Sequence, residues 1–243
     1  MTNLYKGITG STLKWIAIGT MFIDHLAAAI LVRIIIFYGN SEELYTVYRV
    51  MRTIGRVAFP IFCFFLVEGF MRTRNIGKNI GRMALFVILA EIPYDLVFLA
   101  RTPAWEDQSV MLTLLIGLLA MWGCSLIEKK WPENHIVQWV GFVICLGLGM
   151  WLAYLLKTDY AHKGILSIMA MYFFRKDRNM QILAGGITFC WEPWALLAFP
   201  LIYLYNGQRG MKMKYFFYAF YPLHLLLFYL IAMMMGTHFI PVI

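Results

Sequence analysis

The sequence predicts an all-α fold, a polytopic membrane helix bundle of about eight to ten membrane segments that forms a single domain over residues 1–243. Of the 243 residues, 61% are hydrophobic and only 14% are charged, and the mean hydropathy is +0.69. Soluble domains are closer to half apolar and a quarter charged, so this chain has too little polar surface to coat a soluble globule. We therefore expect any chemistry to lie within the membrane or at its edge.

Apolar stretches follow one another along the chain with short connections. A membrane helix needs about 20 apolar residues, because each residue rises about 1.5 Å and the hydrocarbon core is roughly 30 Å thick. The first stretch is too long for the apolar core of a signal peptide, so we expect it to be retained as a helix. The polar segment 39–53 is expected to be an external loop. The stretches cover residues 13–37, 55–70, 83–100, 110–127, 136–156, 164–174, 181–205 and 215–236.

The seventh stretch is interrupted at its centre by Trp191-Glu192-Pro193-Trp194. Proline lacks a backbone donor and glutamate carries charge, so a continuous membrane helix is not expected there. Two interpretations stay open, a pair of half-helices and a kinked helix. Such breaks are tolerated only where protein or water covers the freed backbone groups.

Basic residues indicate how the chain is oriented in the membrane. The segment 71–82 carries four of them and no acid, so the positive-inside rule places it in the cytoplasm. The formal net charge is +8. Its basic residues are distributed by membrane side rather than gathered in one patch, which argues against a nucleic-acid partner. The four basic residues of this cytoplasmic cluster are Arg72, Arg74, Lys78 and Arg82.

The cysteines give no sign of a disulfide framework or a metal site. All of them lie in apolar runs and none has paired spacing, so we interpret them as packing residues. They are Cys63, Cys124, Cys145 and Cys190.

Asp24 and His25 stand side by side near the middle of the first apolar stretch. Ionisable residues at that depth are expensive, so the pair is a candidate working site. The alternative is a buried polar pair that only fastens this helix to its neighbours.

Further polar residues interrupt the later apolar stretches. Glu91 and Asp95 are four residues apart, so they share one helix face, and Pro93 between them predicts a bend. Together they are candidates to line a polar cavity. The structural alternative is that these acids belong to buried ion pairs. The polar residues in question are Glu68, Glu91, Asp95, Glu192 and His224.

A second arginine cluster precedes the second apolar stretch. Arg49, Arg52 and Arg56 recur at spacings of three and four, so on a helix they share a face and require an anionic partner. Lipid phosphate, an internal carboxylate such as Asp24 or Glu91, and a substrate remain open as that partner. The cytoplasmic cluster, in turn, suits the phosphates of a nucleotide, although the positive-inside rule alone also explains it.

The ordered combination of motifs resembles the TraX family, named for the F-pilin acetylase of conjugative plasmids. The resemblance extends over nearly the whole chain. More distantly, a membrane histidine followed by an arginine-bearing segment is similar to the acyl-CoA-dependent membrane acyltransferases. The motifs are Leu13-Lys14-Trp15-Ile16-Ala17, Met21-Phe22-Ile23-Asp24-His25, Gly55-Arg56-Val57-Ala58-Phe59-Pro60-Ile61-Phe62, Val67-Glu68-Gly69-Phe70, Thr73-Arg74-Asn75, Glu91-Ile92-Pro93-Tyr94-Asp95, Asp159-Tyr160 with Gly164, and Tyr221-Pro222-Leu223-His224-Leu225.

This resemblance implies transfer of an acetyl or related acyl group from acetyl-CoA or another acyl-CoA to an acceptor peptide N-terminus, a sugar or a small amine, at a bacterial inner membrane. His25 is the expected general base, because imidazole accepts protons near pH 7. Asp24 either orients His25 or pairs with Arg52 or Arg56, and these arginines are candidates to stabilise the oxyanion. The cytoplasmic cluster Arg72, Arg74, Lys78 and Arg82 would hold CoA. The candidates for the acceptor side are Glu91, Asp95, Asp159, Tyr160 and His224, and His224 is also the alternative base.

Two other function classes remain open. A proton-coupled transporter of a small anion would also use membrane arginines, a broken helix and a mid-membrane histidine. It would be favoured by corresponding broken segments in two halves of the chain, and the sequence has one clear break. A noncatalytic membrane assembly protein would use its polar residues as packing contacts, so that changing Asp24 or His25 would impair folding rather than activity alone.

Overall fold

A computed structural model describes residues 7–39, 41–211 and 214–242, and confirms the all-α prediction. The described residues contain no β-strand and only two isolated backbone bridges. The helices follow in the order α1 Gly10–Leu26, π-helix Ala27–Leu31, α2 Val32–Tyr38, α3 Glu42–Gly55, α4 Ala58–Arg72, α5 Ile76–Tyr94, π-helix Asp95–Leu99, α6 Val110–Lys130, α7 His135–Leu155, α8 Ala161–Phe173, α9 Arg178–Thr188, 3-10 helix Pro193–Leu197, α10 Ala198–Tyr203 and α11 Lys214–Met234.

Five helical spans in the described residues are long and apolar enough to cross a membrane. Two of them join consecutive helices, since α1, the π-helical segment and α2 run on without a break, as α3 and α4 do with a turn at Arg56 and Val57. The protein is therefore a multi-pass membrane protein, and the higher count of eight to ten segments stays a prediction. The spans are Gly10–Tyr38, Glu42–Arg72, Val110–Lys130, His135–Leu155 and Phe216–Met234.

The prediction of a loop over 39–53 is wrong, because helix α3 begins at Glu42. The Ser41 side chain accepts a hydrogen bond from the backbone N–H of Leu44, and Glu42 and Glu43 place negative charge at the positive end of the helix dipole. The segment is amphipathic rather than apolar, so its low mean hydropathy did not indicate the helix, which continues into α4 after a turn. Arg49 and Arg52 are thereby carried on this helix, and Arg56 is the residue that follows its last turn.

The expected interruption of the seventh stretch is confirmed. Helix α9 ends at Thr188, residues 189–192 form turns, and a 3-10 helix begins at Pro193 with Glu192 as its cap. Proline is favourable at this first helical position because its missing N–H would have no partner there. The break places Glu192 immediately before the start of a helix.

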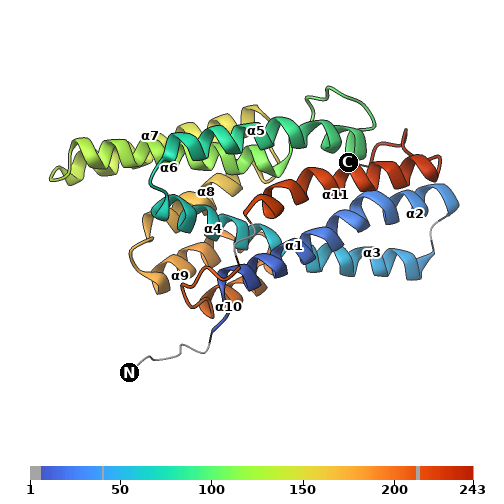
Figure 1. The fold of residues 1–243 in the computed structure, drawn as a ribbon, viewed down its shortest axis with the longest axis horizontal. Coiled ribbons are helices and arrows are strands. Elements are labelled where there is room, and N and C mark those ends of the chain that lie inside the picture. Colours follow the sequence, from blue (N-terminus) through green and yellow to red (C-terminus); the bar gives the residue numbers. More distant parts are fainter. Residues whose placement is uncertain (1–6, 40, 212–213, 243) are drawn as a thin grey trace. The chain divides into compact units, whose positions relative to one another are not determined.

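The chain divides into two compact units, each of which contains residues distant in sequence. The first unit comprises Met1–Phe62, Ile92–Pro103 and Phe189–Ile243. In it, α3 packs along α1, and α11 contacts both α1 and the π-helical segment that follows it (Figure 1). Asp24 and His25 lie on α1, Arg49 and Arg52 on α3, and His224 on α11.

The second unit comprises Cys63–Glu91 and Ala104–Thr188. Helices α6, α7 and α8 pack against one another, and α9 packs against α8 (Figure 1). An ion pair of 2.6 Å between Arg175 and Glu128 joins the end of α8 to the end of α6. The single-domain prediction is not tested by this division, since compact units within one chain need not be separate domains.

Candidate functional site

Two histidines from opposite ends of the sequence meet in the first unit. Nδ1 of His25, on α1, lies 2.7 Å from Nε2 of His224, on α11. The ring planes are inclined by only 5° and the ring centroids are 5.0 Å apart, as expected for two imidazoles joined edge to edge. The nitrogen lone pair lies in the plane of its ring, so this geometry favours a direct hydrogen bond.

The hydrogen-bond network assigns the tautomers of both rings. Nδ1 of His224 lies 2.8 Å from the carbonyl oxygen of Phe220, which only accepts, so Nδ1 of His224 carries the hydrogen. Nε2 of a neutral His224 then has a lone pair and accepts a hydrogen bond from Nδ1–H of His25. This leaves Nε2 of His25 unprotonated and able to accept a proton, which is the state a general base requires.

Aromatic rings surround the histidine pair. Phe98 and Tyr221 each meet the ring of His25 edge-on, with centroids 5.8 Å away, and Phe228 meets His224 in the same manner at 5.6 Å. His224 itself is only 4% exposed. The pair therefore lies in apolar surroundings, where a hydrogen bond is stronger than in water.

Asp24 is joined to α3 rather than to its neighbour in sequence. Its Oδ2 accepts a hydrogen bond of 2.8 Å from Nη1 of Arg52, and both side chains are largely buried, with 14% and 28% of their surfaces exposed. Of the partners considered for Asp24, the structure thus has Arg52. Its other oxygen, Oδ1, is buried and has no hydrogen-bond partner among the described residues.

Gly55 makes this approach of α3 to α1 possible. A Cβ atom at position 55 would overlap the side chain of Asp24, so only glycine allows the two helices this close contact. The glycine that begins this sequence motif is therefore explained by the packing of α3 against α1.

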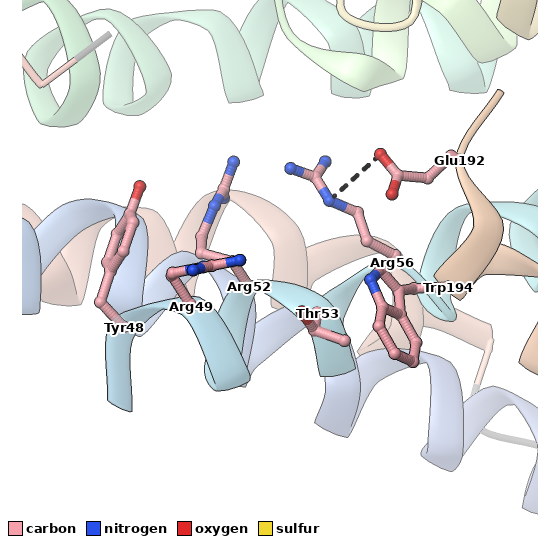
Figure 2. A pocket seen from close by; sticks show the side chains of 7 residues that line it. All are labelled: Tyr48, Arg49, Arg52, Thr53, Arg56, Glu192 and Trp194. Atoms are coloured by element: carbon pink, nitrogen blue, oxygen red, sulfur yellow. Dashed lines mark ion pairs between the residues drawn. The ribbon is translucent and has the colours of Figure 1, made fainter. Parts of the chain in front are cut away.

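The expected common face of Arg49, Arg52 and Arg56 is confirmed. All three line one pocket of about 310 Å³ on α3, which we call the arginine pocket (Figure 2). Figure 2 shows Tyr48 at one end of it and Glu192 at the other, pointing toward Arg56. Nε of Arg56 lies 3.6 Å from Oε2 of Glu192. The complete lining is Tyr48, Arg49, Arg52, Thr53, Arg56, Glu192 and Trp194.

The basic cluster that is predicted to be cytoplasmic belongs to the second unit. It lies at the end of α4, in the short connection after it and in the first turns of α5. Arg72 forms an ion pair of 2.7 Å with Glu68 one turn earlier, and Arg178 lies 3.5 Å from the same carboxylate. Arg74 and Lys78 are exposed and Arg82 is partly buried. The predicted role of the cluster in holding CoA is not tested by these contacts.

The acids proposed for the acceptor side are spread over both units. In the second unit, Glu91 accepts hydrogen bonds from the backbone N–H and the hydroxyl of Ser109, the residue that precedes α6. In the first unit, Asp95 is buried and begins a π-helical segment, where the register of the helix changes after Pro93. Glu91 thus has a structural contact, and the acceptor roles of both acids stay predictions.

Asp159 and Tyr160 form the turn between α7 and α8 in the second unit. The backbone of Asp159 accepts a hydrogen bond from the hydroxyl of Thr113 and donates one of 2.8 Å to the carbonyl of Gln108. Tyr160 has a φ of 63°, in the left-handed region. These contacts explain the position of the turn, and the predicted contribution to the acceptor end remains a prediction.

The family model described as TraX protein matches residues 9–232. The chain belongs to the TraX family. This TraX-family chain is also 27% identical over 235 residues to the probable fimbrial assembly protein FimC, serogroup H1, of Dichelobacter nodosus, an alignment that covers 88% of the chain and 92% of that relative. No solved structure matches it. All of the motifs on which the resemblance rested fall inside the matched residues, so the prediction of the family is confirmed.

Sequence reasoning missed two features of the first unit. Glu192 was noted as a break in a helix, and its contact with Arg56 required the fold. Arg33 was overlooked, although it is a charged residue inside the first apolar stretch. Its side chain is fully buried and donates hydrogen bonds to the backbone carbonyls of Ala29, Val97, Thr237 and Ile240.

Proposed function

We propose that this membrane protein is an acyltransferase, which moves an acetyl or related acyl group from acyl-CoA to an amine or hydroxyl of an acceptor. The observation that carries the proposal is the hydrogen bond between His25 and His224, because its tautomers leave Nε2 of His25 free to accept a proton. A histidine that served only as packing would not need a second imidazole to select its tautomer.

Proton transfer at His25 accounts for the reaction. The acceptor's N–H or O–H proton passes to Nε2 of His25 while its nitrogen or oxygen forms a bond to the carbonyl carbon of the thioester. The carbon–sulfur bond then breaks, its electron pair goes to sulfur, and the imidazolium returns the proton to that sulfur. The products are an amide or ester, free CoA and neutral His25, and His224 keeps the ring oriented throughout.

Arginine side chains are suited to the charge that develops on the thioester oxygen. A guanidinium carries five N–H donors, and the ion pairs engage Nη1 of Arg52 with Asp24 and Nε of Arg56 with Glu192. Donors already fixed by ion pairs need little reorganisation during the reaction, which is what stabilises an oxyanion effectively. In this proposal Asp24 is a positioning residue for Arg52.

The two substrates are assigned to different parts of the chain. Arg72, Arg74, Lys78 and Arg82 hold the phosphates of CoA, and the exposed positions of three of them suit a soluble donor. Asp95, Asp159 and Tyr160, with Glu91, contribute to the acceptor end. We place the protein in a bacterial inner membrane with the segment 71–82 in the cytoplasm, as its charge indicates.

The name of the relative suggests the kind of acceptor to test first. That relative is described as a probable fimbrial assembly protein. A peptide N-terminus on a fimbrial subunit is therefore one acceptor to assay, beside sugars and small amines.

Binding and transfer measured on the same purified protein test the proposal. Saturable binding of acetyl-CoA by calorimetry is expected for the wild type, and the double change Arg72→Ala with Arg74→Ala should weaken it. Folded His25→Ala protein should bind acetyl-CoA and fail to transfer the acetyl group. A monodisperse wild type that does not bind acetyl-CoA would contradict the proposal and favour an anion transporter. Loss of folding in His25→Ala, with no transfer by the wild type, would favour a noncatalytic assembly role.

A further inference from the structure

We propose that the arginine pocket binds a phosphate ester carried by the acyl acceptor. The inference rests on the proposed acyltransferase function and names the chemical class of its second substrate. All residues that line the pocket lie in the first unit.

The lining is rich in hydrogen-bond donors. Arg49, Arg52 and Arg56 carry guanidinium groups, which only donate, and Trp194 contributes an indole N–H that also only donates. The hydroxyls of Tyr48 and Thr53 can donate or accept a hydrogen bond. Among the side chains that line the pocket, the carboxylate of Glu192 is the one group that only accepts. A complementary ligand must therefore be rich in acceptor oxygens.

Charge balance favours an anion. Arg52 is paired with Asp24 and Arg56 with Glu192, so two of the three arginines are already compensated. Arg49 forms no ion pair with a carboxylate in the part of the chain that the structure describes. The pocket and its partners thus retain one net positive charge, which a phosphate diester with one negative charge would balance and a monoester would exceed slightly.

Geometry distinguishes phosphate from carboxylate. The arginines recur along one face of α3, so their planar groups can approach a single ligand from several directions. A carboxylate offers two oxygens in one plane, whereas a phosphate ester offers several in a tetrahedral arrangement. Guanidinium groups bind phosphate oxygens in pairs, and such charge-assisted bonds are roughly twice as strong as neutral ones.

Size and position argue that the ligand is part of the acceptor rather than CoA. A volume of about 310 Å³ lies at the lower end of pockets for small molecules, which hold about 300 to 1,000 Å³, and suits a head group better than a nucleotide with its pantetheine arm. The charge of the segment 71–82 also predicts that the α3 end of its span faces away from the cytoplasm, where acyl-CoA is found.

Calorimetry on the whole chain tests this inference. The protein is kept in dodecyl maltoside, a detergent without phosphate, and titrated with sn-glycerol 3-phosphate, with glycerol as the neutral probe. We expect saturable binding of the phosphate ester only, weakened about tenfold in Arg49→Gln, because one charge-assisted contact is lost. Arg49→Lys keeps the charge without the planar fork and should give a smaller loss. Arg101→Gln removes an exposed charge outside the pocket and is the matched control.

Two further measurements identify the source of the phosphate. When the detergent micelles also contain phosphatidylglycerol, weaker binding of the soluble probe to the wild type would mean that a lipid-borne phosphate occupies the pocket. Unchanged binding would mean that a soluble ester does. The inference is overturned if the probe does not bind, or if Arg101→Gln weakens binding as much as Arg49→Gln.

The outcomes are separable from those of the proposed function. Acyl transfer without phosphate binding would overturn the pocket's assignment and leave the acyltransferase standing. Phosphate binding without acetyl-CoA binding or transfer would overturn the acyltransferase proposal. The pocket would then be a phosphate site of another purpose, and the assignment of its ligand to an acyl acceptor would also be wrong.

Discussion

His25 and His224, which are 199 positions apart in sequence, share a hydrogen bond of 2.7 Å between Nδ1 and Nε2. The carbonyl of Phe220 holds the far side of His224, so a backbone group of α11 selects the nitrogen of His25 that remains without hydrogen. This arrangement resembles the way in which a carboxylate orients a catalytic histidine, with an imidazole in place of the carboxylate.

Replacing either histidine should affect acyl transfer, but by different amounts. His25→Ala removes the base and is expected to lower the transfer rate by about 10²-fold or more, the range that general base catalysis contributes. His224→Ala leaves the base with an unselected tautomer and should have a smaller effect, which His224→Gln partly restores because its amide oxygen accepts from Nδ1–H. Transfer of radiolabelled acetyl groups measures these rates.

The control for the histidine variants is His135→Ala, an exposed histidine at the start of helix α7. It should transfer acetyl groups at the wild-type rate. If folded His25→Ala protein transfers acetyl groups at the wild-type rate, His25 takes no part in the reaction.

The ion pair of Asp24 with Arg52 should contribute more to the free energy of unfolding than a surface ion pair does. Asp24→Asn or Arg52→Gln alone leaves the other partner largely buried with its charge uncompensated, and we expect each to lower stability by about 1 to 3 kcal/mol. The double variant should lose less than the sum of the two, because it leaves no isolated charge. Thermal unfolding in detergent measures all four proteins, and strictly additive losses would show that the pair is not coupled.

Gly55→Ala tests the close contact between α3 and α1. The added methyl group would overlap Asp24, so the helices must separate, which we expect to destabilise the protein by about 1 to 3 kcal/mol. Gly19→Ala on α1 is the matched control, since its Cβ meets no atom within 4 Å and alanine favours a helix. If both variants unfold at the same temperature, α3 and α1 are not in close contact at Gly55.

Arg33 should be a stabilising residue of the first unit. Its guanidinium satisfies carbonyls in three chain segments that leave regular α-helical geometry, and in a membrane no water replaces it. Arg33→Met is expected to cost about 3 kcal/mol or more, because those carbonyls lose their donor. Arg33→Lys should recover part of the loss. The unfolding temperature in detergent reports the effect, with exposed Arg101→Lys as the reference, and a stable Arg33→Met protein would refute this role.

Much of the fold was predictable because it depends on local sequence. Apolar runs predicted membrane helices, since burying their backbone groups in lipid requires helical hydrogen bonds. The break at Glu192-Pro193 followed from the missing proline donor, and the common face of Arg49, Arg52 and Arg56 followed from helical periodicity. Helix α3 was missed because its charged face lowers its hydropathy, so composition indicated a loop where capping residues begin a helix.

The sequence by itself determined which side chains are costly in a membrane, because that cost depends only on residue type and on the surrounding apolar run. Asp24, His25 and the arginines of α3 were identified in this way. Only the tertiary structure decided their partners, since contacts between His25 and His224, Asp24 and Arg52, or Arg56 and Glu192 join segments that no local periodicity relates. A hydrogen bond acts over about 3 Å, so its partner is set by how helices pack.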